Sequence, residues 1–152
     1  GYLLDEMYVE AIADGSHLPA ELLQLIYKVK GPRRVCLVTD SMCAAGMPDG
    51  EYSLGGVPCI KENGVAKLMD RSAFAGSVAT TDMLVRTFCN LTGAPLYDVV
   101  RMTSLTPAEM LGIGTRTGSI QVGKAADLLV FDEDVQLKHI VVAGRTEFST
   151  LQ

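Results

Sequence analysis

Two short segments of this chain combine residue types that can move protons or hold a ligand. Asp40 follows the apolar run 35–38 and Thr39, while the segment Asp14–His17 follows the apolar stretch 8–13. A carboxylate at the end of a buried strand can act as a general base or a metal ligand, because its surroundings set how tightly it holds a proton. The alternative is an aspartate that only caps its own loop through backbone N–H groups. Position alone leaves these two roles of Asp40 open.

His17 is one of two histidines in the chain. An imidazole can bind substrate or shuttle a proton near neutral pH, although a histidine in a surface loop can also have no such role. A shared edge with Asp40 would favour the functional role. The other histidine, His139, lies in a polar approach to a late β pattern, and we expect it to be exposed.

The elements around these segments predict a strand, a helix and a second strand. Apolar residues recur at helical spacing over 20–29, and Gly31-Pro32 supplies a stop signal. A nearly continuous apolar run such as 35–38 is typical of a parallel strand covered on both faces. Because a right-handed crossover places both strand ends at one face, we expect Asp14–His17 and Asp40 on the same rim.

Beyond residue 50 the pattern changes to short β segments with helices between them. The turn signals Gly55-Gly56 and Asn63-Gly64 predict a small meander. Thr106-Pro107-Ala108-Glu109 predicts a capping box that opens a short helix ending near Gly112. The expected strands are 51–54, 57–60, 65–69, 119–122, 126–131 and 139–142, and the expected longer helices are 78–91 and 96–104. We expect the early and late strands to join in one sandwich-like layer.

Bulk properties exclude several classes of protein. The net charge is −5, from 18 acidic and 13 basic residues, with no basic block that would suit nucleic acid. No apolar run approaches the ~18 residues of a membrane span. The four cysteines, at 36, 43, 59 and 89, match neither a metal knuckle nor a dense disulfide framework. They predict reduced, structural thiols and a cytoplasmic location.

No metal-binding residue is predicted within this chain. A catalytic zinc generally takes three protein ligands, and no trio of His, Cys or carboxylates has zinc-site spacing. Ser77, in Ala75-Gly76-Ser77, lacks the surroundings and the adjacent base of a nucleophile elbow. We expect Ser77 to start a helix or to lie in a loop that touches ligand.

Several sequence blocks occur in order along nearly the whole chain. They are Ile12–His17, Leu37–Asp40, Ala44–Tyr52, Leu54–Gly56, Ala75–Ser77, Thr106–Ala108 and Gly118–Leu128. Together they resemble the N-acetylglucosamine-6-phosphate deacetylase family of the amidohydrolase superfamily. The last block is shared widely among amidohydrolases, whereas the Asp-Gly-x-His and Thr-Asp pair with the following loop is more specific to the deacetylases.

The resemblance implies an α/β fold, namely the C-terminal portion of a TIM-like amidohydrolase barrel with part of a β-sandwich. The last two parallel strands would lie in this chain, so the barrel would be incomplete. The implied divisions are 1–50 for the last barrel strands and loops, 51–70 for the meander of the sandwich, 71–117 for helices on the barrel, and 118–152 for the C-terminal sandwich strands. Two buried strands cannot cover their own faces, so we expect a missing N-terminal part.

The resemblance also implies a metal-dependent hydrolase that converts N-acetylglucosamine 6-phosphate to glucosamine 6-phosphate and acetate. A divalent metal, zinc or iron, held by upstream Glu and His residues, would bind water. Asp40 would take a proton from that water and return it to the leaving amine. The implied substrate-binding residues are Asp14, Gly15, Ser16, His17, Phe74, Ala75 and Gly76.

Further expectations concern the chain on its own. Without the upstream ligands, it is expected to bind no metal tightly and to be inactive, while the full-length enzyme would be a homodimer acting on a small sugar phosphate. The alternatives are another amidohydrolase, such as a cyclic amidohydrolase or a deaminase, and a truncated, non-catalytic fragment that acts only by association.

Overall fold

The computed structural model describes residues 1–151 of the chain. The helices are α1 (Ala20–Lys30), α2 (Thr81–Thr92), α3 (Leu96–Thr103) and α4 (Leu105–Met110). The strands are β1 (Val9–Ala11), β2 (Val35–Leu37), β3 (Gly50–Leu54), β4 (Val57–Glu62), β5 (Val65–Leu68), β6 (Leu128–Phe131), β7 (Leu137–Val142) and β8 (Arg145–Ser149).

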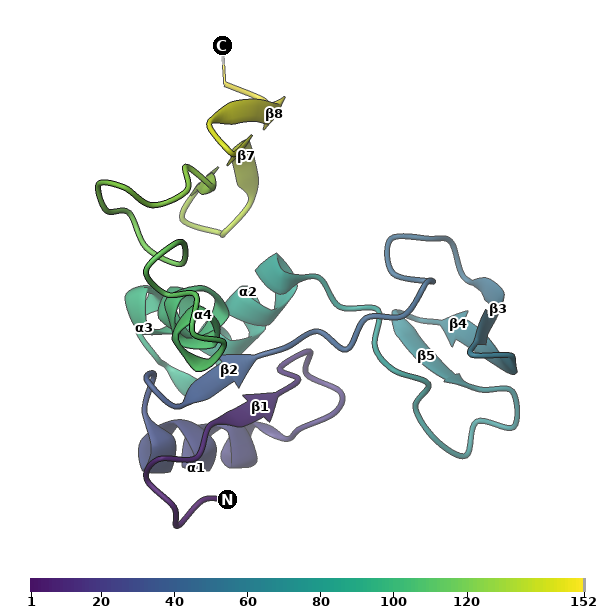
Figure 1. Cartoon of the computed structure of the whole chain (residues 1–152). Coiled ribbons are helices and arrows are strands. Elements are labelled where there is room, and N and C mark those ends of the chain that lie inside the picture. The colour runs from purple at the N-terminus through teal and green to yellow at the C-terminus, as the bar shows by residue number, and fades with distance from the viewer. Residues whose placement is uncertain (152) are drawn as a thin grey trace.

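The predicted strand, helix and strand at the N-terminal end are confirmed. β1 and β2 pair in parallel, with Val9 opposite Val35 and Ala11 opposite Leu37, and α1 connects them. All three residues of β2 are buried, as its continuous apolar sequence predicts. Figure 1 shows α1 on one side of this strand pair and α2, α3 and α4 on the other.

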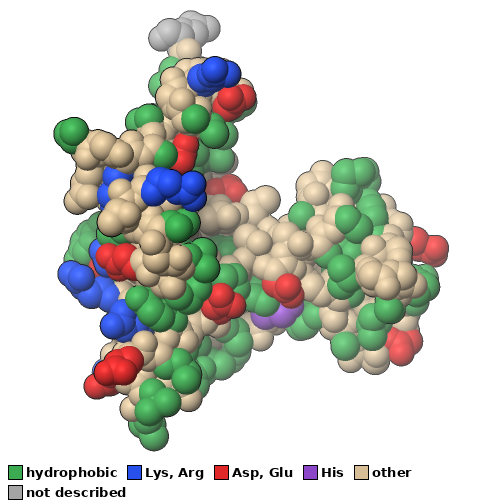
Figure 2. Space-filling view, viewed as in Figure 1, with side chains coloured by type: hydrophobic (Ala, Val, Ile, Leu, Met, Phe, Trp, Pro, Cys, Tyr) green, Lys and Arg blue, Asp and Glu red, His purple; other side chains and the backbone are tan. Residues whose placement is uncertain are grey.

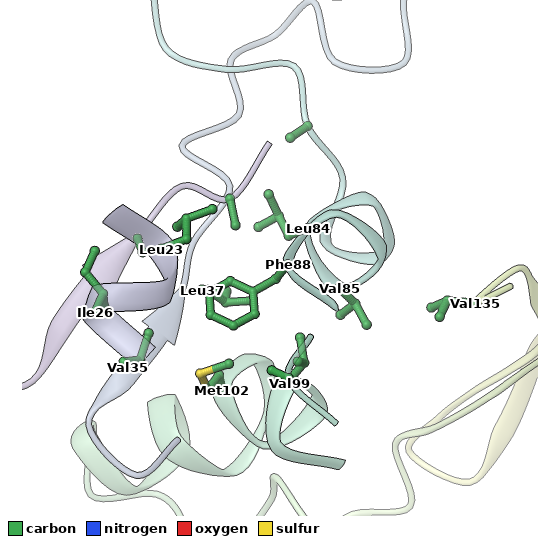
Figure 3. Packing of buried hydrophobic residues seen from close by; sticks show 14 residues of the cluster. Leu23, Ile26, Val35, Leu37, Leu84, Val85, Phe88, Val99, Met102 and Val135 are labelled. Atoms are coloured by element: carbon green, nitrogen blue, oxygen red, sulfur yellow. The ribbon is translucent and has the colours of Figure 1, made fainter. Parts of the chain in front are cut away.

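The main core forms where these helices meet β2. Phe88 extends from α2 and lies close to Leu37 of β2, between Leu23 of α1 and Met102 of α3 (Figure 3). The side chains of Leu23, Phe88 and Met102 are fully buried. Burial of each such side chain contributes about 1.5–3 kcal/mol, so this contact fixes the helices against the strand.

The predicted meander is also confirmed. β3, β4 and β5 form an antiparallel sheet whose two turns contain Gly55-Gly56 and Asn63-Gly64. All four turn residues have positive φ, which is the backbone conformation that tight two-residue hairpins require. A second, smaller core of Met42, Ala44, Cys59, Ala66 and Ala75 lies against this sheet.

The C-terminal strands depart from expectation in two ways. β6, β7 and β8 form a sheet of their own, so the expected joining with the meander is wrong within residues 1–151. Each sheet is completed by local hairpins, and Figure 1 shows the two sheets at different sides of the helices. The predicted strand at 119–122 is a loop, since Ile120 and Val122 lie exposed with no neighbouring strand, and β8 was not predicted.

The capping box predicted at Thr106 is wrong. α4 begins two residues earlier than predicted, at Leu105, and no side chain caps its N-terminus. The fully buried Thr106 hydroxyl donates instead to the carbonyl oxygen of Pro32, at 2.6 Å, and Glu109 pairs with Arg101 at 2.7 Å. Packing against the loop before β2 therefore replaces the local cap, while the predicted helix end near Gly112 is confirmed by the C-cap at Leu111.

Large apolar side chains remain exposed over the helices and both three-stranded sheets (Figure 2), among them Leu25 of α1 and Leu129 of β6. None of the helices within residues 1–151 is long and apolar enough to cross a membrane.

The four cysteines are free thiols, as predicted. Burial raises the pKa of Cys36 and of Cys89, so both thiols stay protonated at neutral pH.

The substitution Thr106→Val tests the tertiary role of this hydroxyl. It keeps the side-chain shape but removes the donor to the buried Pro32 carbonyl, so we expect the free energy of unfolding to fall by about 1–2 kcal/mol. Urea denaturation of the chain measures the change. Thr81→Val, at an exposed position in the first turn of α2, is the matched control and should change stability by less than about 0.5 kcal/mol. Equal losses in the two variants would contradict this role.

Candidate active site

Three segments that are distant in sequence meet beyond the ends of the two parallel strands. The loop after β1 carries Asp14–His17, the continuation of β2 carries Asp40, and the segment 74–79 lies in the connection from β5 to α2. The third segment contacts both of the others, through Phe74 on His17 and through Ser77 on the backbone at Asp40. The structure therefore brings the sequence-predicted residues into one neighbourhood.

Asp14 holds its own loop in shape. Its Oδ1 accepts hydrogen bonds from the backbone N–H of Ser16, at 2.9 Å, and of His17, at 3.0 Å, while Oδ2 lies 2.8 Å from His17 Nδ1. Partial burial acts to raise the pKa of Asp14, but these bonds from His17 and Ser16 outweigh it and hold that pKa below its ordinary value of 3.8. Asp14 is thus ionised at neutral pH and orients the imidazole.

His17 also packs against an aromatic ring. The centroids of its imidazole and of the Phe74 ring are 4.5 Å apart, with 35° between the planes. The His17 side chain is 16 % exposed, whereas Phe74 is 43 % exposed. With Nδ1 engaged by Asp14, the remaining ring nitrogen, Nε2, is the one that can meet a ligand beside an apolar face.

Asp40 lies just past the point where burial of β2 ends. Its side chain is exposed, and within residues 1–151 its carboxylate forms no hydrogen bond or ion pair. Its backbone is in the left-handed region, with φ of 48°, which aspartate tolerates better than most residues. The low-dielectric surroundings expected of a buried strand end are therefore absent from the described chain, because the fully buried run stops at Leu37.

Gly76 makes the close approach to Asp40 possible. A Cβ at this position would lie 3.0 Å from the Asp40 carbonyl oxygen and 3.7 Å from Oδ2 of the same residue. Its φ of 65° is also a conformation that favours glycine. Only glycine fits here without displacing Asp40, so the backbone of the predicted ligand-contacting segment lies beside the carboxylate.

Two other residues were considered from the sequence. Of the two alternatives for Ser77, the helix start is wrong, because α2 begins at Thr81, and the residue lies in a loop, buried between the segments. His139 is partly buried on β7, with Nε2 3.3 Å from Thr146 Oγ1 and with Nδ1 buried without a partner among the described residues. Its expected exposure is wrong, and it lies on a different sheet from the candidate site.

The donor set does not fit a complete metal site. No group of three or more His, Cys, Asp or Glu side chains within residues 1–151 is arranged to hold a metal ion. Asp40 alone offers one carboxylate, short of the three protein ligands that a catalytic zinc generally takes. Two surface hollows of about 420 and 340 Å³ lie elsewhere, beside α4 with Lys124 and between α2 and loop 133–136. The candidate site is an open rim.

Sequence comparison defines the class of this protein. Residues 4–147 match the profile of the amidohydrolase family, so the chain belongs to that family. Within it, the chain is 34 % identical over 149 residues to N-acetylglucosamine-6-phosphate deacetylase of Lysinibacillus sphaericus, a match that covers 97 % of this chain and 38 % of that protein. The resemblance to these deacetylases predicted from the sequence is thereby confirmed.

Two further comparisons also match this chain to deacetylases of N-acetylhexosamine phosphates. The N-acetylglucosamine-6-phosphate deacetylase structure from Thermotoga maritima superposes with a TM-score of 0.91 at 35 % identity, over 98 % of this chain and 40 % of that one. N-acetylgalactosamine-6-phosphate deacetylase of Escherichia coli O157:H7 is 37 % identical over 139 residues, 91 % of this chain and 36 % of that protein. The chain thus spans about two fifths of these relatives, but 81 % of a shorter relative from Escherichia coli strain K12.

The substitution Asp14→Asn tests the electrostatic role of the loop. The amide cannot carry the charge that His17 and the N–H groups stabilise, so we expect the free energy of unfolding near pH 7 to fall by up to about 1 kcal/mol. Because the folded pKa of Asp14 lies below 3.8, this contribution is present above about that pH and disappears as the pH falls through the folded value. Urea denaturation between pH 7 and pH 2.5 measures the difference.

The control for this experiment is Asp5→Asn, at an exposed position in the N-terminal segment. It should leave the stability difference small at every pH. A destabilisation by Asp14→Asn that stays constant down to pH 2.5 would show that charge is not involved.

Proposed function

We propose that this chain is the C-terminal part of a metal-dependent hydrolase that converts N-acetylglucosamine 6-phosphate and water to glucosamine 6-phosphate and acetate. The observation that carries the proposal is the close approach of Gly76 to Asp40, which places the carboxylate beside a segment that also holds Phe74 against His17. The similarity to deacetylases over nearly the whole chain supports the choice of reaction.

Asp40 is the group that we assign to proton transfer. The oxygen of a water molecule forms a bond to the acetamide carbonyl carbon as the Asp40 carboxylate accepts a proton from that water. The C–N bond then breaks, and the protonated Asp40 returns the proton to the leaving amine nitrogen. One exposed carboxylate with no partner among residues 1–151 is free to serve both steps.

The residues proposed to bind substrate are the loop and the segment around His17. The imidazole can donate to or accept from a sugar oxygen through Nε2, since Asp14 engages Nδ1. The half-exposed ring of Phe74 suits the apolar face of a pyranose, and the backbone of Ala75 and Gly76 lies beside Asp40. Asp14, Gly15 and Ser16 shape the loop.

Metal binding is assigned to the part of the protein that this chain does not cover. We propose that β1 and β2 are the last strands of a TIM-like barrel, with 118–152 in a β-sandwich and 71–117 packing on the barrel. The remainder would supply the ligands of a divalent zinc or iron ion and cover the open rim. We further propose a homodimeric protein in the cytoplasm, where four free thiols would stay reduced.

A second candidate substrate is N-acetylgalactosamine 6-phosphate, because a relative at 37 % identity carries that name. The same acetamide chemistry applies to both sugars, so the proposed role of Asp40 does not distinguish them. Another amidohydrolase reaction, on a cyclic amide or an amino group, and a fragment that acts only by association remain the alternatives. Comparing turnover of both sugar phosphates, a cyclic amide and an aminopurine by the full-length protein separates these possibilities.

The isolated chain is expected to release no acetate from N-acetylglucosamine 6-phosphate and to retain no stoichiometric metal. The reason is that its described residues form no three-ligand group. Purified chain would be examined by metal mass spectrometry and by an enzymatic assay for acetate, with the Thermotoga maritima deacetylase as the positive control. One tightly bound ion per chain together with measurable turnover would contradict this expectation.

Asp40→Asn tests the assigned role in the full-length protein that carries this region. The amide has nearly the same shape but cannot accept the proton, so deacetylation should fall by about 10²- to 10⁴-fold. Metal content should stay unchanged if the ligands lie outside this chain, and mass spectrometry checks it. The control is Asp49→Asn, an exposed aspartate of the following loop, which should retain activity. Full activity in Asp40→Asn would contradict the role.

A further inference from the structure

Ser77 is buried where the segment 74–79 packs against the backbone around Asp40. It is 2 % exposed, although it lies in an irregular segment rather than in a helix or an extended sheet. Its polar side chain therefore requires partners within the protein, since burial of an unpaired hydroxyl is costly. A loop position was one of the two alternatives expected from the sequence, but that expectation does not explain why the side chain is buried.

Every polar atom of Ser77 is engaged, and most partners belong to the backbone around Asp40. The Ser77 hydroxyl donates to the carbonyl oxygen of Thr39 and accepts from the backbone N–H of Ala79, at 3.0 Å. The Ser77 N–H donates to the Asp40 carbonyl oxygen at 2.8 Å, and the Ser77 carbonyl accepts from the N–H of Met42 at 2.9 Å. Ser77 thus binds backbone groups before, at and after Asp40.

Asp40 needs such support because its own backbone conformation is uncommon. With φ of 48° it lies in the left-handed region, which persists where the surrounding structure enforces it. No bond within residues 1–151 holds the carboxylate itself, so the side chain is aimed only by the backbone that carries it. Both peptide groups that flank this residue belong to the stretch that Ser77 binds.

We propose that Ser77 is a positioning residue for Asp40, and that its buried hydroxyl holds the Thr39–Asp40 backbone in the geometry needed for proton transfer. This inference rests on the proposed function of Asp40. Ser77 itself touches neither substrate nor water in this role. Its removal should therefore slow the proton-transfer steps while leaving the binding of the sugar phosphate by the His17 loop nearly unchanged.

The test uses Ser77→Ala and the nearly isosteric Ser77→Cys in the full-length protein. Both lose the strong hydroxyl donor, and the cysteine variant keeps the volume of the buried site should the alanine variant fail to fold. For each we expect kcat to fall at least about tenfold while KM for N-acetylglucosamine 6-phosphate changes less than about twofold. Circular dichroism and thermal denaturation check folding.

Thr106→Val is the matched control, since it also removes a fully buried hydroxyl that donates to a backbone carbonyl, but at the opposite end of β2. It should lower thermal stability and leave both kcat and KM unchanged. Equal kinetic losses in Thr106→Val and the Ser77 variants would overturn the proposal, because a general loss of stability would then explain both. Unchanged kcat in a folded Ser77→Cys protein would overturn it as well.

Failure of the role assigned to Ser77 can be distinguished from failure of the proposed function. If the wild-type protein deacetylates the substrate and Asp40→Asn does not, the function of Asp40 stands whatever the Ser77 variants do. If the wild-type protein has no activity toward either N-acetylhexosamine 6-phosphate, the proposed function fails first, and the role of Ser77 fails with it.

Discussion

The hydrogen bonds between Ser77 and the backbone after β2 connect the two hydrophobic cores of this chain. Ala79, two residues after Ser77, belongs to the main core under α2, whereas Ala75, two residues before it, belongs to the small core under the meander. The paired backbone at Ser41 and Ser77 thus lies where one core passes into the other. Because a buried polar group must be satisfied, this short pairing fixes how the meander and the strand pair meet.

The sequence correctly predicted the elements whose structure depends on neighbouring residues alone, such as β2, the Gly55-Gly56 hairpin and the end of α2. The continuous apolar run of β2 is buried throughout, and the Gly55-Gly56 turn produces a two-residue hairpin because both glycines adopt positive φ. Gly93 ends α2 in the left-handed conformation for the same reason. At these positions the residue type restricts the backbone directly, so a single sequence is sufficient for the prediction.

Several of the wrong predictions concern positions whose structure depends on distant parts of the chain. The sequence at Thr106 is compatible with a helix cap, but burial against the loop at Pro32 offers the hydroxyl a partner 74 residues away. The alternating residues 119–122 suit a strand, yet a strand requires a neighbour, and none lies beside them in the described chain. The buried setting of Ser77 was likewise not predicted, because its hydroxyl donates to Thr39, 38 positions earlier, and such a contact follows no local pattern.

The two parts of the candidate site are positioned by different kinds of contact. Asp14 orients His17 through bonds that span three residues, so the Asp-Gly-x-His segment carries its own geometry and could be identified from the sequence. Asp40 was identified from its position at a strand end, but its backbone conformation depends on contacts that form only when the segment 75–79 folds against it. The geometry of the proposed substrate-binding loop is therefore a local property of this chain, whereas the placement of Asp40, the proposed proton-transfer group, is a property of its tertiary structure. The proposed chemistry would then depend on buried residues such as Ser77 and Gly76 as well as on the exposed carboxylate.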